Sequence, residues 1–488
     1  MNGGLIRLSD AEMQRFLVDG YLVLQPELPE GFHDRVYDRL GTVIERGGNP
    51  FNNLLPLVPE LGRVFGHPRV AGALASILGD DYYLHMHRHC HDRAPGNEAQ
   101  RLHKDSLGNS RYAVDGNRRH HHARWAMAFY YPQHTDEEMG PTAIVPRSQY
   151  LVEQQSEQDE IHLTGPAGTV VLVHYDIWHR AAGTVNAARN RYMVKFLFTR
   201  MSDPVQPSWR HEPGAAAPAL EHSGMAGSAG GGSRADLPEV WGHQWRWHLG
   251  QSGAGAGLPG SADGRLAALF EQLAGEDECA ALQAAYRLGR CGSGAAQPLA
   301  EALRSSHERV RRNAAYGFAP LGAAAVPALR DLAGDGDPAV RARAVDALGD
   351  VGPPARAGET ALTAALADPE QVVREQAADA LGLVCGGAGD ASAAAAALAA
   401  VIQDDNDTVR RNAALSLARI GSGAASAADR VAGALAAGCD DDNLYVNGYS
   451  VLGLRRLATP RAHRELLARL EEARWEARET APAGLRRK

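Results

Sequence analysis

Lysine is almost missing from this chain, which places only three in 488 residues, at Lys104, Lys195 and Lys488. Every other basic side chain is arginine, and the formal net charge is −8. A chain with this balance and no block of like charge offers no basic surface to nucleic acid or to an anionic membrane. We therefore expect neither of them as a partner.

Cysteine and long apolar runs are also scarce. The five cysteines are odd in number and include no C-x-x-C pair, which excludes a disulfide framework and fits a reducing compartment. No apolar run approaches the roughly 20 residues of a membrane span, and the N-terminus does not have the pattern of a signal peptide. We expect a cytoplasmic protein, and its length predicts two or three domains.

Histidine, in contrast, is abundant, with 20 residues. On an extended strand His103 and Asp105 would point to the same face, so that one imidazole nitrogen and one carboxylate oxygen could bind a single ion. His179, which follows an apolar strand pattern, is the candidate third ligand. Two histidines and one carboxylate form the facial triad that holds Fe(II) and leaves one face open for a chelating co-substrate and O2.

The same His-x-Asp spacing occurs twice more. His134 and Asp136 lie in an acidic, turn-rich segment rather than in a strand pattern. Apart from His179 itself, no histidine that could complete a site follows His174 and Asp176 before the glycine-rich linker. Context therefore favours the pair that begins at His103.

The N-terminal part predicts helices followed by many short strands. Ser9 and Glu12 have the spacing of a capping box, and Gly20 is expected to end that helix. Two further helices are expected at about residues 30–46 and at 68–78. The later stretches have period two and are separated by Gly and Pro, which predicts a jelly roll or barrel with the metal site in its mouth.

Four histidines, His85, His87, His89 and His91, alternate along one expected strand and so fall on one side of it. They either line the pocket, where His85, His87 and His89 would bind substrate, or form an exposed polar face. A second metal site is disfavoured, because alternate positions on one strand do not converge on one ion.

Together these motifs resemble the phytanoyl-CoA dioxygenase family of Fe(II)/2-oxoglutarate oxygenases, over residues 8 to about 200. The matching motifs stand in the family's order: Leu8-Ser9, Asp19-Gly20-Tyr21, Pro68-Arg69-Val70, His103 with Asp105, Gly140-Pro141-Thr142, Pro146 with Ser148, His179 and Arg191. The family fold is a double-stranded β-helix, in agreement with the strand pattern. One departure is Arg147, where a glycine usually precedes the serine, and it leaves the geometry of that loop open.

The resemblance implies that Arg191 binds the distal carboxylate of 2-oxoglutarate, since a guanidinium forms a bidentate, charge-assisted pair with a carboxylate. Arg189 is its rival, but precedes the strand and is expected to face solvent. Trp125 is the second residue that we expect to contact the co-substrate.

Lys195 alternates with Arg191 on the last strand of this region. If Arg191 points into the barrel, Lys195 does so as well, and we expect it to face the substrate. A buried ammonium needs either a protein acid or an anionic substrate group. The alternative is that the strand ends early and Lys195 reaches solvent.

The second half of the chain repeats. Val-Arg pairs recur at spacings of 30, 33 and 36 residues, each before an alanine-rich helix: Val310-Arg311, Val340-Arg341, Val373-Arg374 and Val409-Arg410. Such periods predict an α-solenoid, and the units resemble HEAT repeats. Acidic residues such as Asp337 and Asp407 are expected to form a ladder with arginines of the neighbouring repeat.

The expected fold is therefore multidomain. Residues 1–205 form a double-stranded β-helix of the jelly-roll or cupin-like kind with flanking helices, and residues 206–262 a linker with a tryptophan-rich helical segment. Residues 263–475 form an all-α HEAT-repeat solenoid, in which 28 Asp and Glu against 22 Arg again disfavour nucleic acid. Residues 476–488 are expected to be a disordered tail.

These features favour an Fe(II)/2-oxoglutarate-dependent oxygenase that uses O2 to hydroxylate a small polar molecule in bacterial secondary metabolism. The solenoid would serve docking to a protein partner or self-association. The alternative is a non-catalytic scaffold with a vestigial oxygenase domain, against which the intact set His103, Asp105, His179 and Arg191 argues. A halogenase is disfavoured, because Asp105 fills the position that halogenases leave empty for halide.

Overall fold

The computed structural model describes residues 4–106, 120–184, 187–217, 235–251, 263–387 and 389–479. The chain divides into two compact units, one holding the chain up to Arg200 together with Gln206–His248, the other holding Met201–Val205 and Leu249–Thr480. Among the described residues, no helix combines the length and the apolar character that crossing a bilayer requires. Flexible stretches are also expected at 227–232 and 250–260, and these residues lie outside the described ones except for 250 and 251. Of the tail expected at 476–488, residues 476–479 belong instead to the last helix, and the rest lies outside the described residues.

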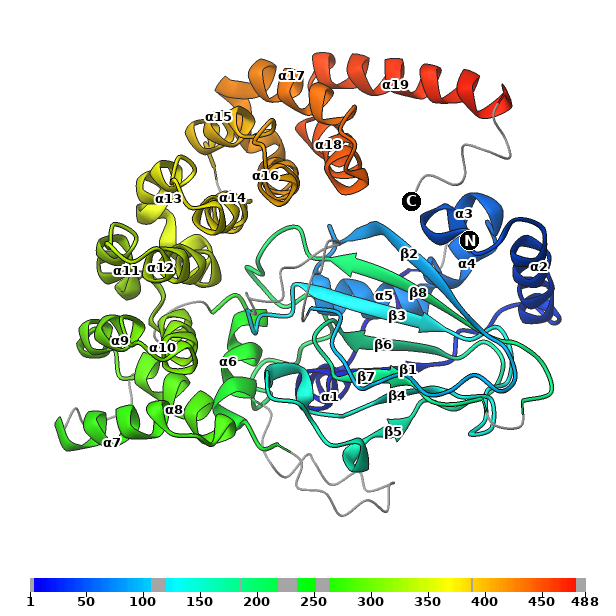
Figure 1. The fold of residues 1–488 in the computed structure, drawn as a ribbon, viewed down its shortest axis with the longest axis horizontal. Helices are drawn as coiled ribbons and strands as arrows, with labels where there is room; N and C mark the ends of the chain where they lie inside the picture. Colours follow the sequence, from blue (N-terminus) through cyan, green and yellow to red (C-terminus); the bar gives the residue numbers. More distant parts are fainter. Residues whose placement is uncertain are drawn as a thin grey trace. The chain divides into compact units, whose positions relative to one another are not determined.

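The first unit contains a β-barrel and its flanking helices (Figure 1). Its strands are β1 (Tyr21–Leu24), β2 (Tyr83–Arg93), β3 (Trp125–Tyr130), β4 (Thr142–Ile144), β5 (Ile161–His162), β6 (Val170–His174), β7 (His179–Ala181) and β8 (Arg191–Thr199). Its helices are α1 (Asp10–Asp19), α2 (Phe32–Gly47), α3 (Leu54–Leu57), α4 (Leu61–Phe65), α5 (Pro68–Leu78) and α6 (Pro238–His248).

The strands form two antiparallel sheets, with orders β1-β6-β3-β8-β2 and β5-β4-β7. Side chains from both sheets fill the space between them, among them Phe129, Ile144, Val171 and Leu197. On the outer face of the larger sheet, Phe65 at the end of α4 stacks on Phe196 of β8 with ring centroids 4.1 Å apart. The expected two-sheet fold with flanking helices is confirmed.

Strand β8 is central to the site because it pairs with β3 on one side and β2 on the other. On β2 the partners of Lys195 and Arg191 are His89 and Arg93. Directly opposed residues of antiparallel strands share a face, so His89 and His91 of β2 line the same side as Lys195 and Arg191 of β8, whereas the register shifts between Leu84 and Arg88.

The tryptophan-rich segment forms helix α6, which packs within the first unit. The ring of Trp245 lies 5.2 Å from that of Trp209, and Trp247 stacks on His122 with ring centroids 4.4 Å apart. Trp241 and Trp245 are both buried. Burial of these large side chains gives α6 a substantial apolar contact area.

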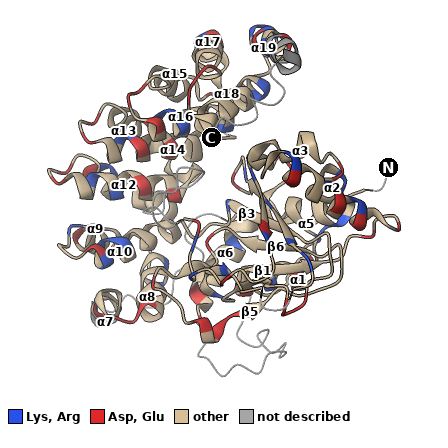
Figure 2. Ribbon diagram, turned by 45° about the vertical axis from the view of Figure 1, so that its right-hand side comes forward, with Lys and Arg blue, Asp and Glu red and all other residues tan. Residues whose placement is uncertain are grey.

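The second unit is all-helical, and its helices follow one another in a row from α7 to α19 (Figure 1). They are α7 (Asp263–Ala274), α8 (Glu278–Arg290), α9 (Ala296–Leu303), α10 (Glu308–Leu321), α11 (Val326–Leu332), α12 (Pro338–Val351), α13 (Glu359–Ala365), α14 (Gln371–Cys385), α15 (Ser392–Ala400), α16 (Asp407–Ile420), α17 (Ala428–Gly438), α18 (Leu444–Leu457) and α19 (Pro460–Glu479). Acidic and basic residues lie side by side on this unit, for example on α12 (Figure 2). The expected all-α repeat fold is confirmed.

Small side chains let neighbouring repeats approach closely. A Cβ atom on Gly382 of α14 would lie 2.2 Å from the Ser416 hydroxyl of α16, and that hydroxyl donates to the carbonyl of Ala378 at 2.6 Å. A Cβ on Gly349 of α12 would likewise lie 2.9 Å from Ala380. At these two positions the close packing of the stacked helices thus requires glycine.

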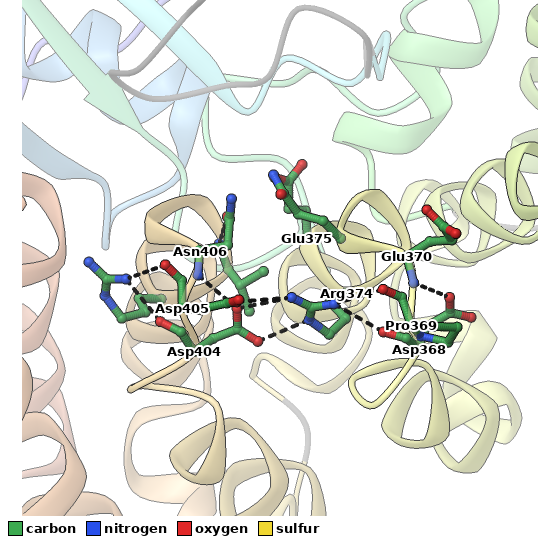
Figure 3. Close-up of polar contacts among 11 residues, drawn as sticks. Asp368, Pro369, Glu370, Arg374, Glu375, Asp404, Asp405 and Asn406 are labelled. Atoms are coloured by element: carbon green, nitrogen blue, oxygen red, sulfur yellow. Dashed lines mark hydrogen bonds and ion pairs between the residues drawn. The ribbon is translucent and has the colours of Figure 1, made fainter.

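An arginine–aspartate ladder connects successive repeats (Figure 3). Arg374 forms a two-point ion pair with Asp404 of the next repeat, at 3.0 and 3.3 Å, and donates to the carbonyl of Asp368 in its own repeat at 3.1 Å. Arg341 binds Asp368 in the same way, and Arg410 binds Asp441. A ladder was expected, but its acidic members were misplaced by the sequence argument.

The two aspartates named for that ladder have other roles. Asp337 caps α12 by accepting a hydrogen bond from the amide of Ala339, so the acidic partner in its repeat is Asp335. Asp407 accepts a hydrogen bond from the side chain of Asn443. Asp337 is thus used as a helix N-cap and Asp407 lies in the first turn of α16, and the carboxylates of the ladder come from the turn before each helix.

Candidate metal centre

Two segments from distant parts of the sequence bring the candidate ligands together. His103 and His179 form an isolated β-bridge with two backbone hydrogen bonds, of 3.0 and 2.9 Å. The strand expected around His103 and Asp105 is not present: the bridge is a single residue pair, and Asp105 already lies in the following turn. The turn nevertheless directs its carboxylate to the same side as the imidazole.

The three side chains face a common point. Asp105 Oδ1 lies 3.9 Å from His103 Nε2 and 3.8 Å from His179 Nε2. All three ligand atoms lie within 4.8 Å of one another, and this is the only such group of His, Cys, Asp or Glu found in the described part of the chain. Neither the His134 pair nor the His174 pair belongs to such a group.

Backbone carbonyls fix both imidazole rings. His103 Nδ1 lies 2.8 Å from the carbonyl oxygen of Arg101, and His179 Nδ1 lies 3.0 Å from that of Ile177. Because a carbonyl oxygen only accepts, each Nδ1 carries the proton and donates, which leaves the lone pair on Nε2. Both rings are thus held in the tautomer and the orientation that a metal ligand needs.

Lys104, the residue between the candidate ligands His103 and Asp105, is a buried lysine that was not expected at the site from the sequence. Lys104 is 2% exposed and donates to the carbonyl oxygens of Ser148 and Leu151, at 2.9 and 2.5 Å. Its ammonium also lies 5.6 Å from the centre of the Trp178 ring. Ser148 also contacts the residue before His179, because its hydroxyl accepts a hydrogen bond from the amide of Trp178 at 3.0 Å. Lys104 therefore fixes the position of His103 and Asp105 relative to His179.

The structure brings Lys195 into this cluster. Its ammonium donates to Asp105 Oδ2 at 2.8 Å. Burial alone would raise the pKa of the Asp105 carboxyl, but the charges of Lys195 and His179 and this hydrogen bond hold that pKa well below its usual range. Burial is the main reason why the pKa of His179 falls to about 4, so its imidazole is neutral near pH 7.

The histidines of β2 lie beside this cluster and are only partly or not at all exposed. Burial first, and then the charge of Lys195, lower the pKa of His87 and of His89 to about 4 each. Neutral imidazoles can donate and accept hydrogen bonds without adding charge to the site. This burial does not fit an exposed polar face, and substrate binding by His85, His87 and His89 stays a prediction.

Arg191 is fully buried at the start of β8. Its Nε donates to the carbonyl of Gly140 at 3.1 Å and its Nη1 to that of His91 at 3.5 Å, while its buried Nη2 has no hydrogen-bond partner among the described residues. The rival Arg189 is exposed and lies over the Tyr37 ring at 4.5 Å. The Nη2 of Arg191 is thus a buried donor that is available to an anion.

Trp125 lies at the other end of β8 from Arg191. It pairs with Thr199, eight residues after Arg191, a separation of roughly 26 Å along a strand. Its ring contacts that of His85, which is buried, at 5.7 Å. The structure therefore does not bring Trp125 and Arg191 to one small molecule, and it groups Trp125 with His85 instead.

Comparison with known families finds one match in each of the two parts of the chain. Residues 9–191 match the family described as phytanoyl-CoA dioxygenase (PhyH), and residues 296–382 and 359–443 match HEAT repeats. No curated protein sequence matches the chain.

Several solved structures resemble part of the chain. One is SnoK, a non-heme alpha-ketoglutarate-dependent carbocyclase from nogalamycin biosynthesis, with 16% identity over 41% of this chain and 88% of that chain and a TM-score of 0.33. HygX from Streptomyces hygroscopicus, with nickel and 2-oxoglutarate bound, has 14% identity over 42% and 90% and a TM-score of 0.34. EctD from S. alaskensis, with bound Fe, has 15% identity over 44% and 84% and a TM-score of 0.34. Similarities at this level carry no argument about the ligands of this chain.

Proposed function

We propose, from the premise that residues 9–191 are a domain of the phytanoyl-CoA dioxygenase family, that this chain is an Fe(II)- and 2-oxoglutarate-dependent oxygenase. The observation that carries the proposal is the group His103, Asp105 and His179, whose ligand atoms face one another. We further propose that the substrate is a small polar molecule hydroxylated in bacterial secondary metabolism, and that the HEAT repeats serve docking or self-association.

The donor set suits a ferrous ion. Two neutral imidazole nitrogens and one carboxylate oxygen are the ligands of the 2-His-1-carboxylate sites that leave positions open. The backbone carbonyls that accept hydrogen bonds from Nδ1 of both rings leave Nε2 of each ring as the nitrogen that can bind a metal. When bound, the iron and 2-oxoglutarate would supply the activation of O2 and the two electrons that complete its reduction.

The chain's own residues would bind, orient and protect. His103, Asp105 and His179 would hold the metal, and the unpaired Nη2 of Arg191 would bind a carboxylate of 2-oxoglutarate. Phe129, whose ring lies 6.1 Å from that of His179, belongs to the apolar wall that keeps water from the inner side of the site.

The ligand assignment is tested by substitution. We expect His103→Ala and Asp105→Ala to abolish metal-dependent conversion of 2-oxoglutarate to succinate while the circular dichroism of the fold is retained. Turnover that persists in wild-type protein after exhaustive chelation, with no metal added, would contradict the proposal.

The co-substrate assignment has a matched control in the neighbouring arginine. With metal present, Arg191→Ala should weaken 2-oxoglutarate binding by about 100-fold, because the charge-assisted hydrogen bond from Nη2 to the carboxylate is lost. Arg189→Ala should change it by less than about threefold, since that side chain faces solvent. Equal effects of the two substitutions in calorimetric titrations would remove Arg191 from the site.

A further inference from the structure

The two oxygens of Asp105 face different partners. Oδ1 faces the two imidazoles, 3.9 Å from His103 Nε2 and 3.8 Å from His179 Nε2. Oδ2 accepts the hydrogen bond from Lys195 Nζ at 2.8 Å. One carboxylate thus joins the candidate metal centre to a permanent cation.

Lys195 contacts the carboxylate oxygen of Asp105 that does not face His103 and His179. It lies in the middle of β8 between Phe129 of β3 and His89 of β2, and its side chain is 10% exposed. Asp105 is its one hydrogen-bond partner among the described residues. A buried ammonium is costly without an acid, so this pair is strongly held.

We propose that Lys195 restricts Asp105 to binding the metal through one oxygen and, by doing so, lowers the affinity of the centre for a divalent ion. This rests on the proposed function. Without Lys195, both carboxylate oxygens of Asp105 would be free to chelate the ion. The positive charge of the ammonium, which repels a divalent cation, would also be removed. One-oxygen ligation keeps a coordination position open for the co-substrate or O2.

This role differs from the one expected from the sequence. A substrate-facing ammonium was one of two ways to satisfy Lys195, and the structure provides the other, a protein acid. Lys195 is therefore a positioning residue, which acts on the metal through Asp105. We therefore expect Lys195 to change the metal affinity of the protein even when no substrate is present.

The experiment is a titration of the full-length metal-free protein with Co(II), by calorimetry and by the visible d–d absorption of the ion. Lys195→Met should bind Co(II) about tenfold more tightly than the wild type, with a changed d–d intensity that reports added coordination. Lys195→Arg keeps the charge and the donors and should stay within about threefold of the wild type. Lys104→Met removes the other buried lysine near the site, whose carbonyl partners hold the ligand segment, and should weaken Co(II) binding.

The outcomes separate this inference from the proposed function. Failure of the folded wild type to bind one Co(II) per chain would remove the metal centre itself. If the wild type binds and Lys195→Met has unchanged or weaker affinity, or the same spectrum, Lys195 does not restrain Asp105. If Lys195→Met unfolds by circular dichroism, Lys195→Gln, which keeps a donor without the charge, must show tighter binding than Lys195→Arg for the inference to hold.

Discussion

Arg147 stands where the sequence pattern of the matching family has a glycine, and the structure explains how an arginine fits there. Its φ is +69°, in the left-handed region where glycine is the usual residue. In return, its guanidinium contacts Asp19 at 3.3 Å and Asp236 at 3.2 Å and lies 5.6 Å from the ring of Trp241. The loop keeps the geometry that a glycine would give it, and the side chain holds helix α6 in place.

Substitutions at this position should separate backbone strain from side-chain contacts. Arg147→Ala keeps the strained conformation and loses the contacts, whereas Arg147→Gly loses the contacts and relieves the strain. We expect the alanine variant to be less stable than the glycine variant by about 1 kcal/mol. Urea unfolding followed by tryptophan fluorescence measures this, because six of the seven tryptophans belong to the first unit. Equal stability of the two variants would show that the left-handed conformation carries no strain.

Among single residues, the three candidate ligands were predicted from the sequence, but the lysine that holds their segment in place was not. His103, Asp105 and His179 were singled out by spacing and by the absence of a third ligand for the rival pairs. Lys104 was missed because nothing in a local pattern says that an ammonium will be buried. The one available signal was scarcity: of three lysines in the chain, the two at Lys104 and Lys195 are both buried beside the site.

Among elements, the arginine–aspartate ladder shows how the repeats are joined. Each arginine binds a carboxylate of the next repeat and a carbonyl of its own, so its side chain spans the junction. The acid of each pair is largely shielded from solvent, as with Asp404, which is 11% exposed. Shielded two-point pairs are stronger than ordinary surface ion pairs.

Asp404 and Asp405 are adjacent and both contact Arg374, so substitution of one is a control for substitution of the other. Asp404→Ala removes the two-point pair and the hydrogen bond to the amide of Asn406, and should cost about 1–2 kcal/mol of solenoid stability. Asp405 also touches Arg374, at 3.1 Å, but is 89% exposed, so Asp405→Ala should cost less than about 0.5 kcal/mol. Thermal melts followed by far-UV circular dichroism compare the two, and a larger loss for Asp405→Ala would contradict the assignment.

Elements with strong local signals were predicted well. The capping box of Ser9 and Glu12 and the glycine that ends α1 are both present, and the helix expected at 68–78 has those bounds. The strand around His103 was not predicted correctly, because a period of two describes a side-chain direction and not a hydrogen-bonded partner. Only the pairing with His179, distant in sequence, decides where that segment is extended.

For the whole molecule, the division into two units predicts separate folding. A fragment of residues 1–251 contains both sheets, all the candidate site residues and α6. We expect it to be folded and to bind metal and 2-oxoglutarate within about threefold of the full-length affinity, since solenoid repeats are stabilised by their neighbours in the array. Calorimetric titration of the fragment measures this. A large loss of 2-oxoglutarate affinity would show that the solenoid completes the site.

The ladder also sets how the solenoid would respond to a mechanical pull. Because each repeat contacts only its neighbours, tension applied at the two ends passes through every junction between repeats in turn. The first link is the softest, since Arg304 forms a single contact with Asp335 and its side chain is 45% exposed. The later links, at Arg341, Arg374 and Arg410, are two-point pairs. In a stretched solenoid the ladder would therefore loosen first at the Arg304–Asp335 pair, where the ion pair of Arg343 with Glu308 still joins α12 to α10.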